Sequence, residues 1–159
     1  MELTLADLVI GKEHYDPMSA LDPWRWRVGE QCEVLLPTAL GHLFLESNDG
    51  VISFLDTWSG DLHRVAEEYD GFRTIMSSAE SDEFDFLLMP DVVAGLREAG
   101  ILLEPGQCYV PYVSPALGGK FAAENFTVAA LGLHLHTSAA ECRAIGAGEA
   151  QGSVHSTLS

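Results

Sequence analysis

Short apolar runs separated by turn signals fill residues 32–61 and predict a β-meander. Asn48-Asp49-Gly50 is a strong hairpin signal, because a type I′ turn requires residues that accept a positive φ. Ser59-Gly60-Asp61 gives a second turn further along the chain. At least three antiparallel strands are therefore expected, at residues 32–36, 40–46 and 51–56.

Two segments before this meander carry weaker patterns. Residues 3–10 fit a short helix or a strand that ends at Gly11. Residues 24–28 alternate bulky apolar with basic side chains, which predicts a strand with one buried face. Trp24 and Trp26 are expected to pack in the core, since a base-stacking surface would also need a basic groove.

The middle of the chain changes to helical spacing. Residues 62–69 are predicted as a short helix, and residues 71–76 as a further turn or two. The strongest helix prediction is residues 82–99, with Ser81 as N-cap and Gly100 as the end. Pro90 is expected to kink or split that helix. The apolar positions that return at helical spacing are Phe86, Leu87, Val92, Val93 and Leu96.

The last third predicts strands at residues 108–113 and 126–136, with a glycine-containing loop between them. A short helix is expected at residues 138–145, and residues 146–159 are expected to form a flexible tail. The elements together predict an α+β fold. We expect a twisted antiparallel sheet with helices packed mainly on one face, in a single domain of residues 1–145.

Charge narrows the class of partner. Eight Lys and Arg stand against 24 Asp and Glu, so the net charge is −16. This surface would repel nucleic acid, whose binding depends on cations that neutralise phosphates, and it disfavours anionic membranes. Basic proteins are the expected partners, although solubility alone would also explain the acidity.

Acidic residues concentrate between positions 67 and 85, where Arg73 is the single base. Several flank the expected helix start at Ser81 and could act as caps there. The cluster is either a solvated helix surface or a surface that faces a partner. The candidate partner-binding residues are Glu67, Glu68, Asp70, Glu80, Asp82, Glu83 and Asp85.

The sequence predicts a cytoplasmic location. No segment approaches the ~18 consecutive apolar residues of a membrane-spanning helix, and residues 1–4 lack the basic start of a signal peptide. Cys32, Cys108 and Cys142 are odd in number and widely spaced, so they are expected to be reduced thiols in the core.

Catalytic and metal motifs are weak. His134 and His136 would share one face of a strand and could chelate a metal, but no third ligand has suitable spacing. Gly118-Gly119-Lys120 lacks the spacing of a phosphate-binding loop and is interpreted as a tight turn. We therefore expect no cofactor, metal or catalytic site, and a metal enzyme or hydrolase stays an alternative that rests on the histidine pair.

Several short motifs, mostly turn glycines and expected core residues, occur along the chain in a distinctive order. It comprises Thr38-Ala-Leu-Gly41-His-Leu-Phe-Leu45, Asp49-Gly50-Val51, Phe54-Leu55-Asp56, Ser59-Gly60, Gly106-Gln-Cys-Tyr109, Pro115-Ala-Leu-Gly-Gly119, Glu124-Asn125 and Leu133-His134-Leu135. This order resembles the C-terminal domain of type VI secretion immunity proteins that neutralise DNase effectors, a domain often found after a GAD-like region. The resemblance covers about residues 24–145.

The resemblance implies an immunity protein that binds a cognate secreted nuclease toxin and blocks it by stoichiometric occlusion. The acidity agrees, because a DNase must hold a polyanion in a basic cleft. The matching motifs are mostly turn glycines and core residues, so no contact residue is carried over from the family. The alternative is a non-enzymatic regulatory or scaffolding module that binds another basic protein.

Overall fold

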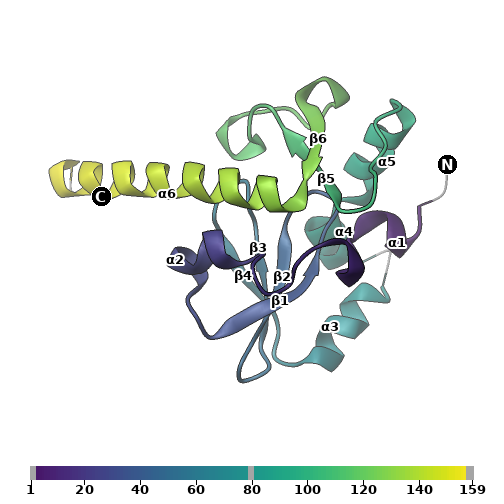
Figure 1. Ribbon diagram of the computed structural model, residues 1–159, viewed down its shortest axis with the longest axis horizontal. Coiled ribbons are helices and arrows are strands. Elements are labelled where there is room, and N and C mark those ends of the chain that lie inside the picture. Colours follow the sequence, from purple (N-terminus) through teal and green to yellow (C-terminus); the bar gives the residue numbers. More distant parts are fainter. Residues whose placement is uncertain (1–2, 79–80, 157–159) are drawn as a thin grey trace.

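The computed structural model describes residues 3–78 and 81–156, with side chains as far as residue 146. Its centre is a four-stranded antiparallel sheet in the order β1-β2-β3-β4, beside a two-stranded antiparallel pair, β5-β6 (Figure 1). The strands are β1 (Cys32–Pro37), β2 (Leu43–Ser47), β3 (Ile52–Leu55), β4 (Leu62–Ala66), β5 (Gln107–Pro111) and β6 (Phe126–Ala130).

The helices stand before, between and after these strands. The α-helices are α1 (Leu5–Leu8), α2 (Arg25–Val28), α3 (Tyr69–Met76), α4 (Asp82–Leu88), α5 (Pro90–Glu98) and α6 (Leu131–Ser156). The 3₁₀ turns are η1 (Lys12–His14), η2 (Asp22–Trp24), η3 (Pro115–Leu117) and η4 (Ala123–Asn125). None of the helices in the described part of the chain is long and apolar enough to cross a membrane.

The predicted meander is confirmed and gains a fourth strand. β2 and β3 pair in register from Leu43↔Leu55 to Glu46↔Ile52. Gly50, in the turn between them, has a φ of 90°, which favours glycine. The mixed α+β class is therefore confirmed.

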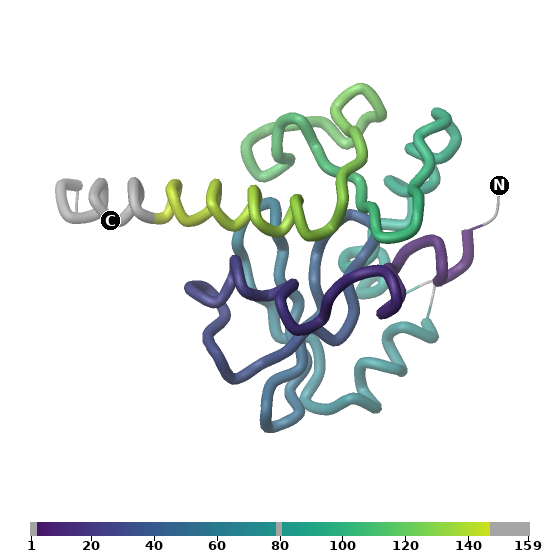
Figure 2. Tube along the Cα trace, in the orientation of Figure 1, coloured from purple at the N-terminus to yellow at the C-terminus, as the bar shows by residue number. Residues whose placement is uncertain are grey.

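Helices cover both faces of the sheet. Phe44, Ile52 and Phe54 share one face and pack against α3, α4 and α5, which lie to the right in Figure 1. Leu43 and Leu55 face the opposite side, where α6 and the N-terminal segment form a second core; Figure 2 shows that segment, in purple, crossing the molecule. The expectation of helices mainly on one face thus differs from the structure, because β2 and β3 are apolar on both faces.

The strand predicted at residues 24–28 is wrong. This segment is helical, with Pro23 in the first turn of η2 and α2 ending at Gly29, whose φ is 80°. Alternation over five residues is too short to separate a strand from a helical turn. Trp24 is buried as expected, whereas Trp26 is exposed at 38% and its ring stacks on Trp24 with 5.7 Å between centroids.

Two further elements differ from expectation. Residues 62–66 form strand β4 rather than a helix, because the turn at Gly60 returns the chain to pair with β3. The strand predicted at residues 126–136 ends at Ala130, and α6 begins at Leu131. α6 then continues through Ser156, so the expected short helix at residues 138–145 is part of a longer one. Residues 157–159 of the expected tail lie outside the described residues.

The helix predicted at residues 82–99 is split at Pro90, as expected. Met89 separates α4 from α5 in a left-handed conformation with a φ of 48°. Ser81 is the N-cap, since its hydroxyl accepts a hydrogen bond from the backbone N–H of Phe84 at 3.1 Å. Gly100, with a φ of 88°, follows the last turn of α5.

Candidate partner-binding site

The predicted acidic residues divide into two groups. One group precedes and opens α3 and the other forms the first turn of α4, so most of the eight-residue helix α3 (about 12 Å long) lies between them. Glu80 lies outside the described residues. The two exposed groups are Glu67, Glu68 and Asp70, and Asp82, Glu83 and Asp85.

The two groups differ in their neighbours. Glu67 forms an ion pair with Arg64, and the Asp70 carboxylate lies 3.9 Å from the Arg73 guanidinium. The α4 group surrounds an exposed aromatic side chain, Phe86, which contacts the His63 ring edge-on. The α4 acids also stabilise the helix N-terminus through its dipole. Both groups are therefore solvated helix starts that could also face a partner.

A groove of about 490 Å³ lies between α6 and the chain segment that follows β5. One wall comes from residues 110–117 and the other from residues 134–145 of α6, with Thr57 and Trp58 between them. The lining contains Val110, Pro111, Tyr112, Val113, Ser114, Leu117, Thr137, Ser138, Glu141, Cys142, Ala144 and Ile145. We call this the α6 groove.

The 112–121 loop that forms one wall is fixed by hydrogen bonds. The backbone N–H of Val113 donates to Asn125 Oδ1 at 3.0 Å, while Asn125 Nδ2 donates to the Val113 and Lys120 carbonyls at 2.8 and 2.9 Å. The Ser114 hydroxyl donates to the Trp58 carbonyl at 3.1 Å. A Cβ on Gly119 would lie 1.8 Å from the Val113 carbonyl oxygen, so this close approach requires glycine.

Beneath the α6 groove two histidines share one threonine. Thr57 donates its backbone N–H to His42 Nδ1 at 3.0 Å, so this nitrogen is an acceptor. The Thr57 hydroxyl donates to the Gly41 carbonyl at 3.0 Å and lies 2.9 Å from His134 Nε2. Because a hydroxyl has a single proton, the neutral His134 satisfies this contact by donating its Nε2–H to Thr57 Oγ1.

Burial keeps both imidazoles neutral. It lowers the pKa of His42 to about 4, and Asp56, whose Oδ1 lies 3.6 Å from His42 Nδ1, opposes this shift. Burial likewise lowers the pKa of His134 to about 4; the adjacent His42 adds to this shift, and the Gly41 carbonyl opposes it. The arrangement is a buried polar network centred on Thr57, which binds both histidines and the Gly41 carbonyl.

The three cysteines are free and buried, as predicted. Burial raises the pKa of Cys108 to about 12 and also raises the pKa of Cys142, which lines the α6 groove. Thiols of raised pKa are poor nucleophiles at neutral pH. The chemistry of the groove therefore favours packing and contact rather than covalent catalysis.

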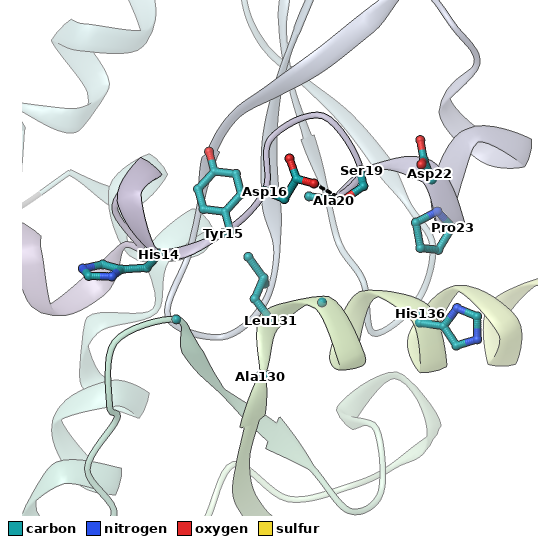
Figure 3. A pocket seen from close by; sticks show the side chains of 12 residues that line it. His14, Tyr15, Asp16, Ser19, Ala20, Asp22, Pro23, Ala130, Leu131 and His136 are labelled. Atoms are coloured by element: carbon teal, nitrogen blue, oxygen red, sulfur yellow. Dashed lines mark hydrogen bonds between the residues drawn. The ribbon is translucent and has the colours of Figure 1, made fainter.

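A second cavity, of about 560 Å³, lies between the N-terminal segment and the start of α6 (Figure 3). In Figure 3 the Leu131 side chain points toward the N-terminal segment, and His136 lies below Pro23. The Asp16 carboxylate accepts hydrogen bonds from the Ser19 hydroxyl and the Met18 N–H within its own turn, so it is already partnered. These hydrogen bonds lower the pKa of Asp16.

His134 and His136 do not share a face. They lie on a helix, where two positions are about 200° apart, so His134 is buried below the α6 groove while His136 is exposed at the second cavity. Among the described residues, no group of three or more His, Cys, Asp and Glu side chains could hold a metal ion. The chelating pair considered from the sequence is therefore not formed.

The α6 groove was not predicted from the sequence. One signal was present, since residues 110–117 read Val-Pro-Tyr-Val-Ser-Pro-Ala-Leu, an apolar composition that is unusual for a surface loop. The structure leaves Tyr112 and Leu117 exposed at 69% and 66%.

Comparison with known proteins gives two findings. The family described as "T6SS immunity protein Tdi1, C-terminal" matches residues 66–139. Among solved structures, Atu4351 from Agrobacterium tumefaciens is similar at a TM-score of 0.55 and 17% identity, covering 82% of this chain and 68% of that chain. This identity supports likeness of fold alone. No match is found among curated proteins.

The matched residues 66–139 run from the end of β4 to the third turn of α6 and include the whole 112–121 loop. A domain of this kind supports an immunity function, implies a cognate toxin as partner and suggests a non-enzymatic role. The resemblance inferred from the sequence is thus confirmed over residues 66–139, which match the C-terminal domain family of the type VI secretion immunity protein Tdi1.

Proposed function

We propose that this chain is an immunity protein that acts in the cytoplasm, where it binds a cognate nuclease toxin and neutralises it by stoichiometric occlusion. The observation that carries the proposal is the match of residues 66–139 to an immunity-protein family. That match supports an immunity function and a toxin partner. The nuclease activity of the toxin and the mode of inhibition are inferred from charge and geometry.

Charge supports a nuclease as the partner. A nuclease cleft must be basic to hold a polyanion, whereas this chain has a net charge of −16. Exposed acids at the starts of α3 and α4 provide the complementary surface. Opposite charges accelerate encounter, which matters for an inhibitor that must capture a toxin before it cuts the DNA of the producing cell.

Inhibition by binding also agrees with the side chains available. His42 and His134 are neutral and committed to Thr57, and the cysteine thiols are buried. An inhibitor that works by occlusion requires only a stable complementary surface, with one inhibitor consumed for each toxin molecule. Activity should therefore fall linearly with added inhibitor and reach its minimum at equal amounts.

Co-expression with the toxin encoded beside this gene tests the proposal. We expect growth to be rescued, the purified pair to elute as one complex, and DNA cleavage to stop at a one-to-one ratio. A toxin that kills normally in the presence of this chain would refute the immunity function.

Occlusion is tested separately with a catalytically inactivated toxin and labelled DNA. We expect the chain to displace the DNA in a binding assay. If the toxin binds DNA equally well inside the complex, occlusion is wrong while immunity stands.

A further inference from the structure

We infer that the α6 groove is the surface that receives the toxin, and that it takes a bulky apolar side chain of the toxin with a Lys or Arg beside it. This inference rests on the proposed function and adds the location and chemistry of the contact. It shifts the centre of the interface away from the acidic groups on α3 and α4. Those groups then act at the periphery, where charge raises the rate of encounter.

Exposed apolar side chains gather at this place. Tyr112, Val113, Leu117 and Ile145 are all exposed large apolar residues, and all line the α6 groove. Phe121 of the 112–121 loop is also exposed, and its ring centroid lies 6.0 Å from that of Trp58. Contiguous apolar surface of this kind on a highly charged protein marks an interaction site.

The loop that presents these side chains is held in shape before any partner arrives. Asn125 is buried and makes three hydrogen bonds to the 112–121 loop, and Ser114 ties that loop to Trp58. Binding therefore pays little for ordering the loop, which favours high affinity. A loop that only connected β5 to β6 would not need both an apolar exterior and a buried amide beneath it.

The negative charge around the groove favours a Lys or Arg of the toxin next to its bulky apolar side chain. Glu141 is the only Asp, Glu, Lys or Arg among the described residues that line the groove, and Lys120 of the loop is not among them. Asp56 and Asp61 lie close enough to add to Glu141 in raising the pKa of Cys142, after the larger effect of burial. The potential at the groove is therefore negative, which complements a cation on the toxin.

The size of the groove fits an anchor side chain. A volume of about 490 Å³ exceeds the space that one aromatic side chain occupies, and it falls in the range of pockets that enclose ligands. Interface energy concentrates where a bulky residue fills a desolvated pocket, whereas charges at the rim add little affinity. The α6 groove provides such a pocket, while the starts of α3 and α4 provide a rim.

The test compares variants of the full chain in binding to the purified, catalytically inactivated toxin encoded beside this gene. The groove variant is Tyr112→Ala with Leu117→Ala. Phe86→Ala is the matched control, because Phe86 is 59% exposed and lies among the acids of α4. All three substituted side chains are exposed, so each variant is expected to keep the thermal midpoint of the unaltered chain.

We expect the groove variant to raise the dissociation constant by about 30-fold or more, mainly through faster dissociation, and Phe86→Ala to change it by less than about threefold. Glu141→Gln should slow association and leave most of the affinity. In a hydrogen-exchange experiment the toxin should protect residues 110–121 and 134–145 more strongly than residues 67–86.

Each outcome decides between the two proposals. If the unaltered chain does not bind this toxin, the proposed function fails and this inference fails with it. If the unaltered chain binds and the groove variant binds equally well, the proposed function stands and the groove is wrong as the contact. A large loss in Phe86→Ala with none in the groove variant would place the contact on α4.

Discussion

Asn125 satisfies both backbone groups of Val113: its Oδ1 accepts from the Val113 N–H at 3.0 Å, and its Nδ2 donates to the Val113 carbonyl at 2.8 Å. The same Nδ2 donates to the Lys120 carbonyl at 2.9 Å. One buried amide thus spans the 112–121 loop and fixes the wall of the α6 groove. Asn125 belongs to the Glu124-Asn125 pair singled out in the sequence, and its side chain shapes the loop.

Replacement of Asn125 should loosen this loop without unfolding the domain. Asn125→Ala removes three hydrogen bonds from a buried amide and leaves the Val113 N–H and carbonyl without these partners, which should lower the free energy of unfolding by about 1–3 kcal/mol. Urea denaturation measures this loss, and hydrogen exchange should show faster exchange in residues 112–121. Asn125→Asp keeps the acceptor but loses both donated bonds, so it should be equally or more destabilised. Unchanged stability in both variants would contradict the bracing role.

Gly41 is required for two separable reasons. Its φ is 83°, and a Cβ there would lie 2.5 Å from the His134 ring. Gly50 has a φ of 90° with nothing within 4 Å of an added Cβ, so Gly50→Ala isolates the backbone strain. We expect Gly50→Ala to cost about 1–2 kcal/mol of unfolding free energy and Gly41→Ala clearly more, because His134 must move. If urea denaturation gave the same loss of unfolding free energy for both variants, the His134 ring would move aside at no energetic cost.

The buried histidines should make the fold sensitive to acid. The pKa values of His42 and His134 are about 4 in the folded chain, compared with 6.5 for an unfolded histidine, so between these values the unfolded state binds more protons. Their contribution is therefore fully present above pH 6.5 and is lost as the pH falls toward 4, by a few kcal/mol in total. NMR titration of the imidazole Cε1–H signals checks both pKa values. His134→Gln keeps a donor for Thr57 but cannot titrate, so its unfolding free energy should depend less on pH; an unchanged dependence would exclude His134 as a cause.

Local turn chemistry was readable from the sequence because each signal acts over a few residues. Ser81, Pro90 and Gly100 perform the roles predicted for them, and Asn48-Asp49-Gly50 forms the turn of the predicted hairpin. That turn is not of type I′, because Gly50 has a positive φ whereas Asn48 and Asp49 do not. The predictions for residues 24–28 and 62–66 are wrong because a five-residue pattern fits a strand and a helical turn equally well. At residues 62–66, long-range pairing with β3 favours the strand. Sheet pairing between distant segments is not encoded in any short window.

The strand predicted at residues 126–136 is wrong from Leu131 onward, although the sequence there contains a helical pattern. Leu131, His134, Leu135, Ser138, Ala139 and Cys142 are all buried and follow the spacing i, i+3, i+4, i+7, i+8 and i+11, which is helical. This helical spacing cannot be recognised within residues 126–136 alone, because half of these buried positions lie beyond its last residue. The α6 groove was missed for a different reason, since it joins residues 57–58, 110–117 and 134–145, which only the fold brings together.

The acidic groups should determine the speed of toxin capture, and unequally. In the α3 group, Glu67 pairs with Arg64 and Asp70 lies 3.9 Å from Arg73, so part of its field is already neutralised. The α4 group, Asp82, Glu83 and Asp85, has no basic residue in its helical turn. Its neutral triple variant (Asp82→Asn, Glu83→Gln, Asp85→Asn) should therefore slow association more than the matched α3 variant (Glu67→Gln, Glu68→Gln, Asp70→Asn).

Stopped-flow kinetics with the toxin at several salt concentrations measures this difference. We expect the α4 variant to slow association about tenfold at low salt, to flatten the salt dependence, and to leave the dissociation rate nearly unchanged. Loss of the acids from the first turn of α4 also removes helix-dipole stabilisation of about 0.3–1 kcal/mol for each charge, so unfolding free energies must be compared in parallel. A dissociation rate that rises with unchanged association would place these acids at the centre of the interface, where an apolar anchor in the α6 groove would no longer account for the affinity.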